Sequence, residues 1–319
     1  MAILRRLISL ILPSILLTGC YEIFDPGLDI APVLCINSII TAGEPIEVDV
    51  TRTWTFDDQT AEYDHNVSDA RVTVYANGVR QGEDYVPAEG DVIRIVAESP
   101  AYGCAEAEVK VPVAASLDNI SYTATVTDIW KNDRYGMCAD LDFNIRLRMT
   151  IHDVDIATDD YFRLDYNWEY PSGCKFYIGG LDYNSEPIFK EHMGAFETIT
   201  GSDDEILTVF SDRRFSGNSY TLDLFFNRGG YRVNSSSYDE EMLDCSVNLT
   251  LSTVSHSYYA GSIYNWQREM GGIDDLSDLG FAQPIWGYSN VSTGAGVVAA
   301  RSCVEYTISL KDFIKSALE

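Results

Sequence analysis

The order of hydrophobic and polar residues along the chain favours an almost entirely β fold. In the first third, short segments alternate apolar and polar residues at a period of two and carry many β-branched residues. These segments are residues 33–40, 46–51, 71–75, 92–97 and 106–113. Turn-forming residues separate them, for example Asn77 with Gly78 and Glu89 with Gly90. Short strands at this spacing are typical of a β-sandwich.

Longer alternating segments follow in the rest of the chain. They are residues 141–151, 161–170, 220–227, 245–253 and 297–310. The polar stretch 153–160 lies between the first two of them. A polar turn between two alternating strands predicts a hairpin, in which residues equally far from the turn lie opposite each other.

One segment, 255–270, departs from the period of two. Its apolar residues Tyr259, Ile263, Trp266 and Met270 recur at spacings of four, three and four. That spacing predicts a helix, which the glycines at 271 and 272 end. We expect the apolar stripe of this helix to pack on a sheet rather than to bind a ligand.

The length of the chain predicts more than one core. A chain of 319 residues exceeds what one hydrophobic core usually holds. We therefore predict two β-sandwich domains, at 33–114 and 116–319. The first is expected to be immunoglobulin- or transthyretin-like, and the second to be larger, with one short helix near 256–270.

The first twenty residues are typical of a lipoprotein signal peptide. Arg5 and Arg6 precede an apolar stretch at 7–17, which is shorter than the roughly 20 residues that span a bilayer. The stretch ends in Leu-Thr-Gly-Cys, which resembles a bacterial lipobox. We predict a signal peptide at 1–19, acylation of Cys20 with chains such as palmitate, and a lipidated tether at 20–32. Two or more acyl chains anchor a protein stably to a membrane.

Net charge narrows the classes of partner. The chain has 22 basic and 49 acidic residues, which gives a net charge of −27 at pH 7. A field of that sign repels nucleic acid and anionic lipid. We therefore expect no nucleic-acid partner, and we expect the acyl chains alone to hold the protein at the membrane.

The cysteines are consistent with export to an oxidising compartment. Apart from Cys20, six remain, at 35, 104, 138, 174, 245 and 303. An even number in an exported chain predicts disulfides, and the absence of CxxC spacing argues against a zinc site or a thioredoxin-like site. Cys138 and Cys174 are equally far from the centre of the turn 153–160, so the hairpin would bring them together. With pairs kept within domains, the predicted disulfides are Cys35–Cys104, Cys138–Cys174 and Cys245–Cys303.

The sequence carries little catalytic chemistry, and we predict a protein that is not an enzyme. None of the histidines, at 65, 152, 192 and 256, lies in a paired ligand spacing. Ser289 lacks the second glycine of a nucleophile elbow. The tryptophans at 54, 130, 168, 266 and 286 can stack on sugars, but core packing is their commoner role.

Acidic clusters raise the question of a metal. They occur at 57–58, 203–205, 239–241 and 274–275. Calcium takes oxygen ligands from flexible loops, but none of these clusters has EF-hand spacing. We interpret them as solvated loops and predict no metal site and no cofactor, while binding of calcium by one of them stays open.

Several segments together resemble a family of surface lipoproteins of Bacteroidota, catalogued as domain of unknown function 4249. The matching segments are residues 32–41, 68–75, 209–217 and 284–296. The last of them, with Asn290, Gly294 and Gly296, also predicts a tight turn that leads into the final strands.

The resemblance implies a function that the residues alone do not. It implies an outer-membrane lipoprotein that faces the cell exterior and serves as an accessory or substrate-capture subunit of a TonB-dependent nutrient transporter, with an unknown ligand. Two alternatives stay open, a fimbrial or adhesive lipoprotein and, with less support, a surface glycan-degrading enzyme.

Overall fold

The computed structural model describes residues 31–54, 65–132, 137–153, 158–182, 186–191, 207–235, 239–269 and 287–319. Residues Val33–Glu319 form one compact unit, separate from Met1–Pro32. The predicted signal peptide, Cys20 and most of the tether lie outside the described residues. Among the residues that are described, no helix is long and apolar enough to cross a membrane.

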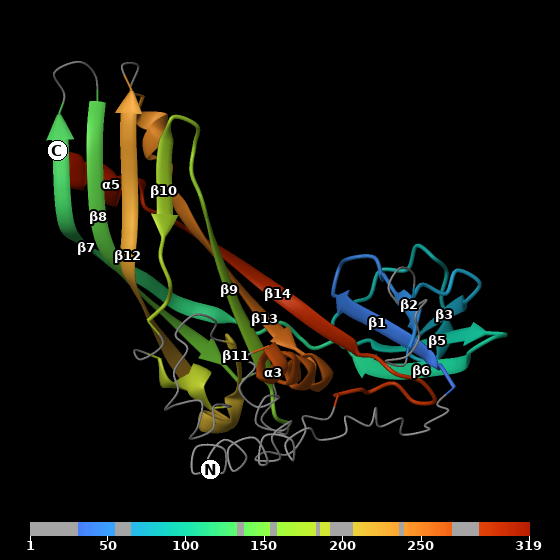
Figure 1. The fold of residues 1–319 in the computed structure, drawn as a ribbon. Helices are drawn as coiled ribbons and strands as arrows, with labels where there is room; N and C mark the ends of the chain where they lie inside the picture. The colour runs from blue at the N-terminus through green and yellow to red at the C-terminus, as the bar shows by residue number, and fades with distance from the viewer. Residues whose placement is uncertain are drawn as a thin grey trace, which may run out of the picture. The chain divides into compact units, whose positions relative to one another are not determined.

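The predicted β-rich fold is confirmed, and its strands form three open sheets (Figure 1). The largest has six strands in the order β11-β9-β13-β14-β1-β2. Their bounds are β11 Val209–Ser211, β9 Tyr161–Glu169, β13 Ser246–Val254, β14 Val298–Ser309, β1 Leu34–Thr41 and β2 Asp49–Arg52. All neighbours run antiparallel except β1 and β14, which pair in parallel, with Ser38 opposite Val298.

The other two sheets have four strands each. One has the order β10-β12-β8-β7, with bounds β10 Cys174–Ile178, β12 Ser219–Ser235, β8 Met137–His152 and β7 Leu117–Asn132. The other has the order β4-β3-β5-β6, with bounds β4 Val79–Arg80, β3 Arg71–Ala76, β5 Val92–Ser99 and β6 Gly103–Lys110. All of these neighbours are antiparallel.

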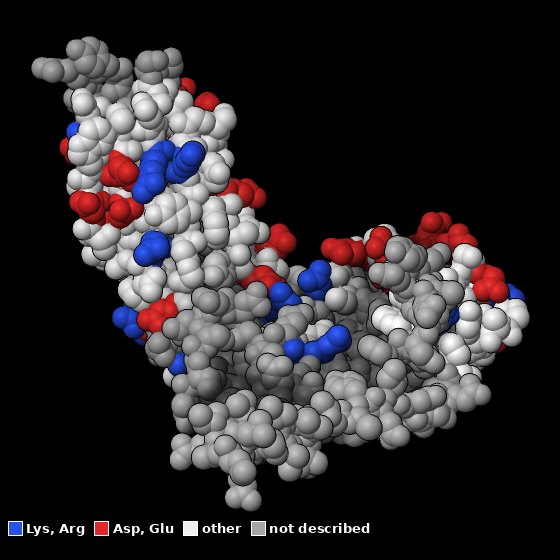
Figure 2. Space-filling model, in the orientation of Figure 1, with Lys and Arg blue, Asp and Glu red and all other residues white. Residues whose placement is uncertain are grey.

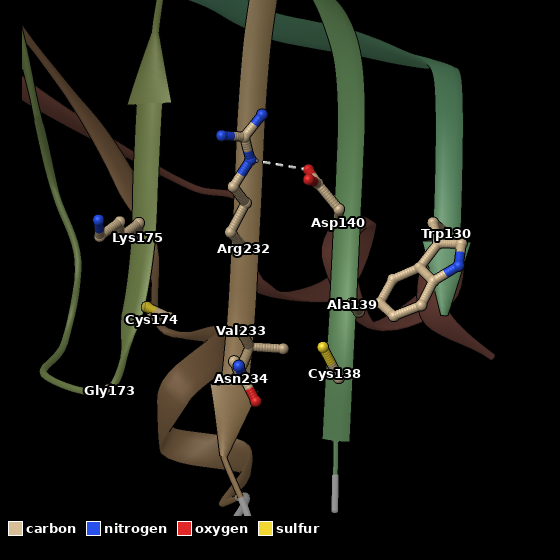
Figure 3. A pocket seen from close by; sticks show the side chains of 10 residues that line it. All are labelled: Trp130, Cys138, Ala139, Asp140, Gly173, Cys174, Lys175, Arg232, Val233 and Asn234. Carbon is tan, nitrogen blue, oxygen red and sulfur yellow. Dashed lines mark hydrogen bonds and ion pairs between the residues drawn. The ribbon is translucent and has the colours of Figure 1, made fainter. Parts of the chain in front are cut away.

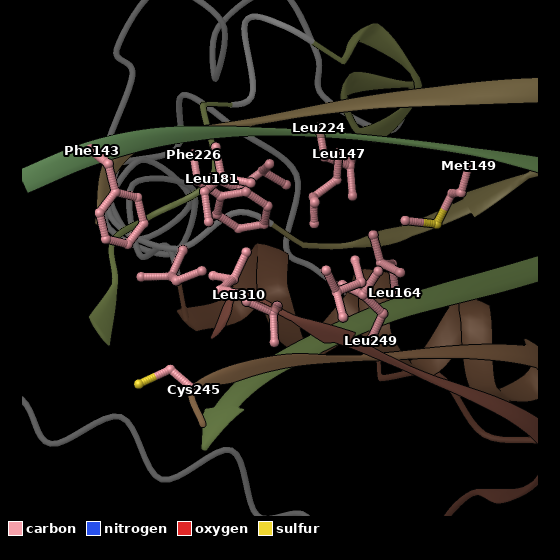
Figure 4. Packing of buried hydrophobic residues seen from close by; sticks show 14 of the residues in the cluster. Phe143, Leu147, Met149, Leu164, Leu181, Leu224, Phe226, Cys245, Leu249 and Leu310 are labelled. Atoms are coloured by element: carbon pink, nitrogen blue, oxygen red, sulfur yellow. The ribbon is translucent and has the colours of Figure 1, made fainter. Parts of the chain in front are cut away.

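The predicted hairpin of residues 141–151 and 161–170 is wrong. β8 pairs with β7 and β12, whereas β9 pairs with β11 and β13 in a different sheet. The reason is hydrophobic burial: Leu147 of β8 and Leu164 of β9 belong to the same core, in which the two sheets face each other (Figure 4). Strands that both carry an apolar face can bury those faces against each other across two sheets instead of pairing edge to edge.

In the described part of the chain, three hydrophobic clusters lie along the six-stranded sheet, and two of them hold most of the buried residues. The larger of these two lies between this sheet and the β10-β12-β8-β7 sheet and includes Phe143, Phe226 and Leu249. The smaller packs β1 against β5 and β6 and includes Ile36 and Ile95. Because one sheet contributes to both clusters, the domain boundary near residue 115 stays a prediction.

The predicted helix is confirmed as α3, His256–Glu269, which buries Tyr258 and Trp266. A second helix, α5 at Lys311–Leu318, follows β14 and buries Ile314 and Leu318. Three 3₁₀ helices complete the described elements: η1 Pro187–Lys190, η2 Asp212–Arg214 and η3 Glu240–Leu243.

Candidate functional site

The six cysteines described by the structure are all free thiols. Cys138 lies opposite Asn234 on one side of β12, and Cys174 lies opposite Val233 on the other side. The pairing Cys138–Cys174 assumed the β8–β9 hairpin, so its basis is lost. Instead, the Cys174 thiol donates to the Pro171 carbonyl at 3.4 Å, and burial raises the pKa of both Cys174 and Cys245.

The other two predicted pairings also conflict with the register of the strands. Cys303 lies opposite Ser252, far along β13 from Cys245, which precedes the first residue of that strand. Cys35 alternates with core residues on β1, as Cys104 does on β6, so both side chains face away from the core that these strands share. The three predicted pairs are therefore corrected, and the formation of any disulfide stays a prediction.

An open groove lies at one end of the four-stranded sheet that contains β7 (Figure 3). It has a volume of about 540 Å³ and takes residues from all four strands. Asp140 of β8 accepts a hydrogen bond of 2.8 Å from Nε of Arg232 on β12, and the Trp130 ring of β7 covers the side next to Cys138. Three of its ten lining residues, Asp140, Lys175 and Arg232, are charged. Because the groove is open, it suits contact with a protein surface better than a small enclosed ligand.

Ion pairs cross the outward face of the same sheet. Arg146 of β8 binds Asp223 of β12 through both carboxylate oxygens, at 2.6 and 2.7 Å, and Nε of Arg148 lies 3.6 Å from the same carboxylate. Figure 2 shows basic side chains next to acidic ones on one face of the molecule. Exposed pairs of this kind contribute little to stability, because water and salt screen them. They mainly make this face less negative than the chain as a whole.

A second hollow, of about 570 Å³, lies beside α3. Tyr258 and Tyr264 of α3 line it, together with Tyr288 and Arg163. The Arg163 guanidinium is held in place because Nε lies 2.9 Å from both oxygens of Asp165 and NH1 donates to the Tyr258 hydroxyl at 2.8 Å. The hollow therefore offers aromatic rings, one oriented cation and the carboxylates of Glu47 and Asp49.

The segment that precedes β14 has the structural role that the sequence predicts. The Asn290 side chain accepts from the amide of Val298 at 2.9 Å and donates to its carbonyl at 2.8 Å. Gly296 has a φ of +110°, and a Cβ there would lie 2.1 Å from the Ile36 carbonyl oxygen. These contacts hold the turn against β1.

Two buried carboxylates stand out among the described residues. Glu186, just before η1, is 2% exposed, and both of its carboxylate oxygens accept hydrogen bonds. It accepts from the Tyr220 hydroxyl at 2.6 Å, from the Asp223 amide at 2.9 Å and from the Ile188 amide at 3.3 Å. Burial, together with Glu186, raises the pKa of Tyr220.

The other buried carboxylate, Asp212, is the first residue of η2 and is fully buried. Neither of its carboxylate oxygens has a hydrogen-bond partner. Oxygens of Asp153, Asp160 and Asp212 all lie within 4.8 Å of one another. The pKa of Asp212 is raised to about 6, mainly by burial and to a smaller extent by the neighbouring carboxylates of Asp153, Asp160 and Asp159.

Comparison with known proteins now places the chain in a family. A family model described as "Domain of unknown function (DUF4249)" matches residues 21–307. The chain belongs to this family. No curated protein and no solved structure matches it. The match covers both hollows and the three aspartates of this DUF4249 chain, whereas α5 lies beyond it.

The structure locates most of the residues that the sequence of this DUF4249 chain singled out. Trp54 stacks on His65 with ring centroids 4.0 Å apart, and His152 Nε2 lies 2.6 Å from Asp118. In the acidic cluster 239–241, Glu240 pairs with Lys315 at 3.0 Å. The other predicted clusters, at 57–58, 203–205 and 274–275, lie outside the described residues, as do His192 and Trp286.

The sequence does not reveal the aspartate cluster, because its members are far apart in the chain. Asp153 and Asp160 belong to the stretch that the alternation predicts as a hairpin turn, and Asp212 lies in a segment that carries only the family resemblance. The one available signal in the sequence was an acid two positions after the apolar pair 209–210, followed by two arginines.

Proposed function

We propose that this chain is an outer-membrane lipoprotein, anchored through acylated Cys20 and exposed to the cell exterior. It serves as a non-catalytic accessory or capture subunit of a TonB-dependent nutrient transporter. The lipobox supports the anchor, and the family match begins at Tyr21, directly after Cys20. The DUF4249 match therefore starts one residue after Cys20, the first residue of the proposed mature chain.

The observation that carries the proposal is the exposed edge formed by β7. This strand is the last in its sheet, and residues 125–132 are all exposed. Val126, Ile129 and Trp130 expose 39%, 42% and 54% of their surface. An edge strand with apolar side chains favours association with another protein, and soluble proteins usually protect such edges. The partner that we propose for β7 is an extracellular loop of the transporter.

The hollow beside α3 supports a role in capture. Its three tyrosines can contact a ligand through their rings and hydroxyls, and Arg163 can bind an anionic or polar group. The site needs no cofactor for this role. The identity of the nutrient does not follow from these side chains.

For the architecture, we propose two β-sandwich domains that share the six-stranded sheet. The first, at 33–114, is immunoglobulin- or transthyretin-like, and the second spans 116–319. The two larger hydrophobic clusters support this division, since one draws on β1, β5 and β6 and the other on β8, β12 and β13.

Both alternatives have weaker support. A fimbrial lipoprotein would release an N-terminal strand by cleavage at a basic residue, and the first basic residue after Cys20 is Arg52, inside β2. A glycan-degrading enzyme needs two carboxyl groups about 5–9.5 Å apart that face a substrate cleft. The acids that converge in the described part of the chain lie around the buried Asp212 instead.

Purification of the tagged full chain from its native outer membrane in mild detergent tests the proposal. We expect a large β-barrel transporter to co-purify, and we expect Trp130→Asp to reduce its recovery at least tenfold. Tyr306→Asp changes a comparably exposed aromatic residue on β14 and should leave recovery unchanged. A monodisperse lipoprotein without any barrel protein would contradict the partner.

The anchor has its own test. Cys20→Ser should accumulate as an uncleaved, non-acylated precursor, detected by mass spectrometry. If the Cys20→Ser chain is cleaved normally and still fractionates with the outer membrane, the lipoprotein assignment is wrong.

A further inference from the structure

Three aspartates converge where the chain crosses between two sheets. Asp153 directly follows β8, Asp160 directly precedes β9, and Asp212 directly follows β11. One carboxylate oxygen from each lies within 4.8 Å of the other two. Calcium binds oxygens at about 2.3–2.6 Å, so two ligands of one ion are at most about 5 Å apart. The spacing of the three carboxylates is therefore that of ligands around a single ion.

The burial of Asp212 is the second, independent observation. Both of its oxygens are inaccessible and neither accepts a hydrogen bond. A buried carboxylate without a partner is strongly disfavoured, so it needs a proton or a cation. The nearest arginine along the chain, Arg213, does not supply the charge, because its Nε lies 3.2 Å from Asp159.

The surrounding backbone already holds the two loops together. The Asp212 amide donates to the Asp160 carbonyl at 3.0 Å, and the Asp153 amide donates to the Asn218 carbonyl at 3.1 Å. The Gly217 amide donates to the Asp153 carboxylate. Asp153 and Asp160 are only half-buried, so an ion and its water ligands can reach Asp212 from solvent.

We propose that Asp153, Asp160 and Asp212 together bind one divalent cation, Ca²⁺. The ligands are hard oxygens from irregular loops, which suits calcium better than magnesium, because magnesium demands a near-ideal octahedron. Water would complete the six to eight oxygens. A site with only three carboxylate ligands, two of them half-buried, fits the affinity of extracellular calcium modules, with a Kd of about 10⁻⁴–10⁻³ M.

The site would fasten two crossovers at once. The chain passes from β8 to β9 and from β11 to β12, and each passage joins the four-stranded to the six-stranded sheet. An ion held by residues at both crossovers therefore clamps the facing sheets at one end of the larger core. This role does not depend on the proposed transporter.

The test uses the full chain stripped with EDTA and titrated with CaCl₂ alone. Calorimetry should show one site, and 10 mM Ca²⁺ should raise the Tm by about 2–6 °C. We expect Asp212→Asn and Asp160→Asn each to weaken binding at least tenfold. Asp159→Asn is the control, because it removes the same charge from a residue next to Asp160 that is not one of the three proposed ligands. Its Kd for Ca²⁺ should stay within threefold of the wild-type value.

Any of three results would contradict the proposed calcium site. They are the absence of binding at 10 mM Ca²⁺, a binding isotherm that is unchanged in Asp212→Asn, and an equal rise in Tm with MgCl₂ at the same concentration. If Asp212→Asn fails to fold, Asp153→Asn and Asp160→Asn decide the matter, since both residues are half-buried on loops. Displacement of Tb³⁺ luminescence by Ca²⁺, lost in the same variants, gives a readout independent of stability.

Discussion

Glu186 and Asp212 are equally buried, yet their surroundings are opposite. Glu186 is 2% exposed and Asp212 is 0% exposed, and each lies at the start of a 3₁₀ helix. Glu186 accepts three hydrogen bonds, whereas Asp212 accepts none and faces other acids. Burial alone therefore says little about what a carboxylate does, and the donors around it decide.

The difference separates a structural acid from a ligand. Glu186 satisfies donors on η1 and β12 and so joins two elements without any added group. Asp212 contributes nothing of this kind until a cation or a proton arrives. Changing each carboxylate to an amide, which keeps its shape, should therefore have opposite effects at the two sites.

The largest effect is expected at Glu186. Glu186→Gln should lower the free energy of unfolding by about 2–4 kcal/mol, because an amide nitrogen would face the Tyr220 hydroxyl or a backbone N–H and leave a buried donor unpaired. Urea denaturation in EDTA measures the change. If the free energy of unfolding falls by less than about 0.5 kcal/mol, Glu186 does not have the structural role that distinguishes it here from Asp212.

A smaller change of opposite sign is expected at Asp212. Without metal, Asp212→Asn should raise the free energy of unfolding by about 1–2 kcal/mol, because it removes a buried, unpartnered charge and supplies donors to Asp153 and Asp160. The same denaturation experiment measures it. Destabilisation of the metal-free chain would mean that Asp212 has partners that its geometry does not show.

The smallest effect concerns pH. The pKa of Asp212 is raised to about 6 by burial and by Asp153, Asp160 and Asp159, with Arg213 the nearby cation. The native state then binds more protons than the unfolded state between about pH 4 and 6, so stability falls as pH rises through this range. In EDTA the wild type should be about 1 kcal/mol more stable at pH 5 than at pH 7. In Asp212→Asn the free energy of unfolding should be about the same at pH 5 and pH 7. If stability depends on pH in the same way in both proteins, Asp212 is not the group responsible.

The elements were predictable from local pattern, but their partners were not. Alternation located most strands, and the four-three-four spacing located α3, because both signals depend on side-chain periodicity alone. The pairing of β8 with β12 rather than β9 depends on which apolar faces meet across the core, and that information is not local. The pairing of Cys138 with Cys174 lost its basis for the same reason, because it depended on the β8–β9 hairpin.

The aspartate site was hidden for a related reason. Neither 153–160 nor 212 carries a ligand spacing, because the cluster forms only when two crossovers meet. The unpartnered state of Asp212 is a property of the folded core. By contrast, the lipobox prediction depends on four consecutive residues, so folding plays no part in it.

The parallel pairing of β1 with β14 constrains the order in which the chain can fold. Asn37 and Val297, joined by a hydrogen bond, are 260 residues apart in sequence. Contacts of such high sequence separation are slow to form, since a long loop must close before they stabilise anything. During synthesis β1 emerges early, and its partner β14 emerges only near the end. Until β14 arrives, the edge of β1 that pairs with it is unpaired, and an unpaired strand edge can associate with other chains.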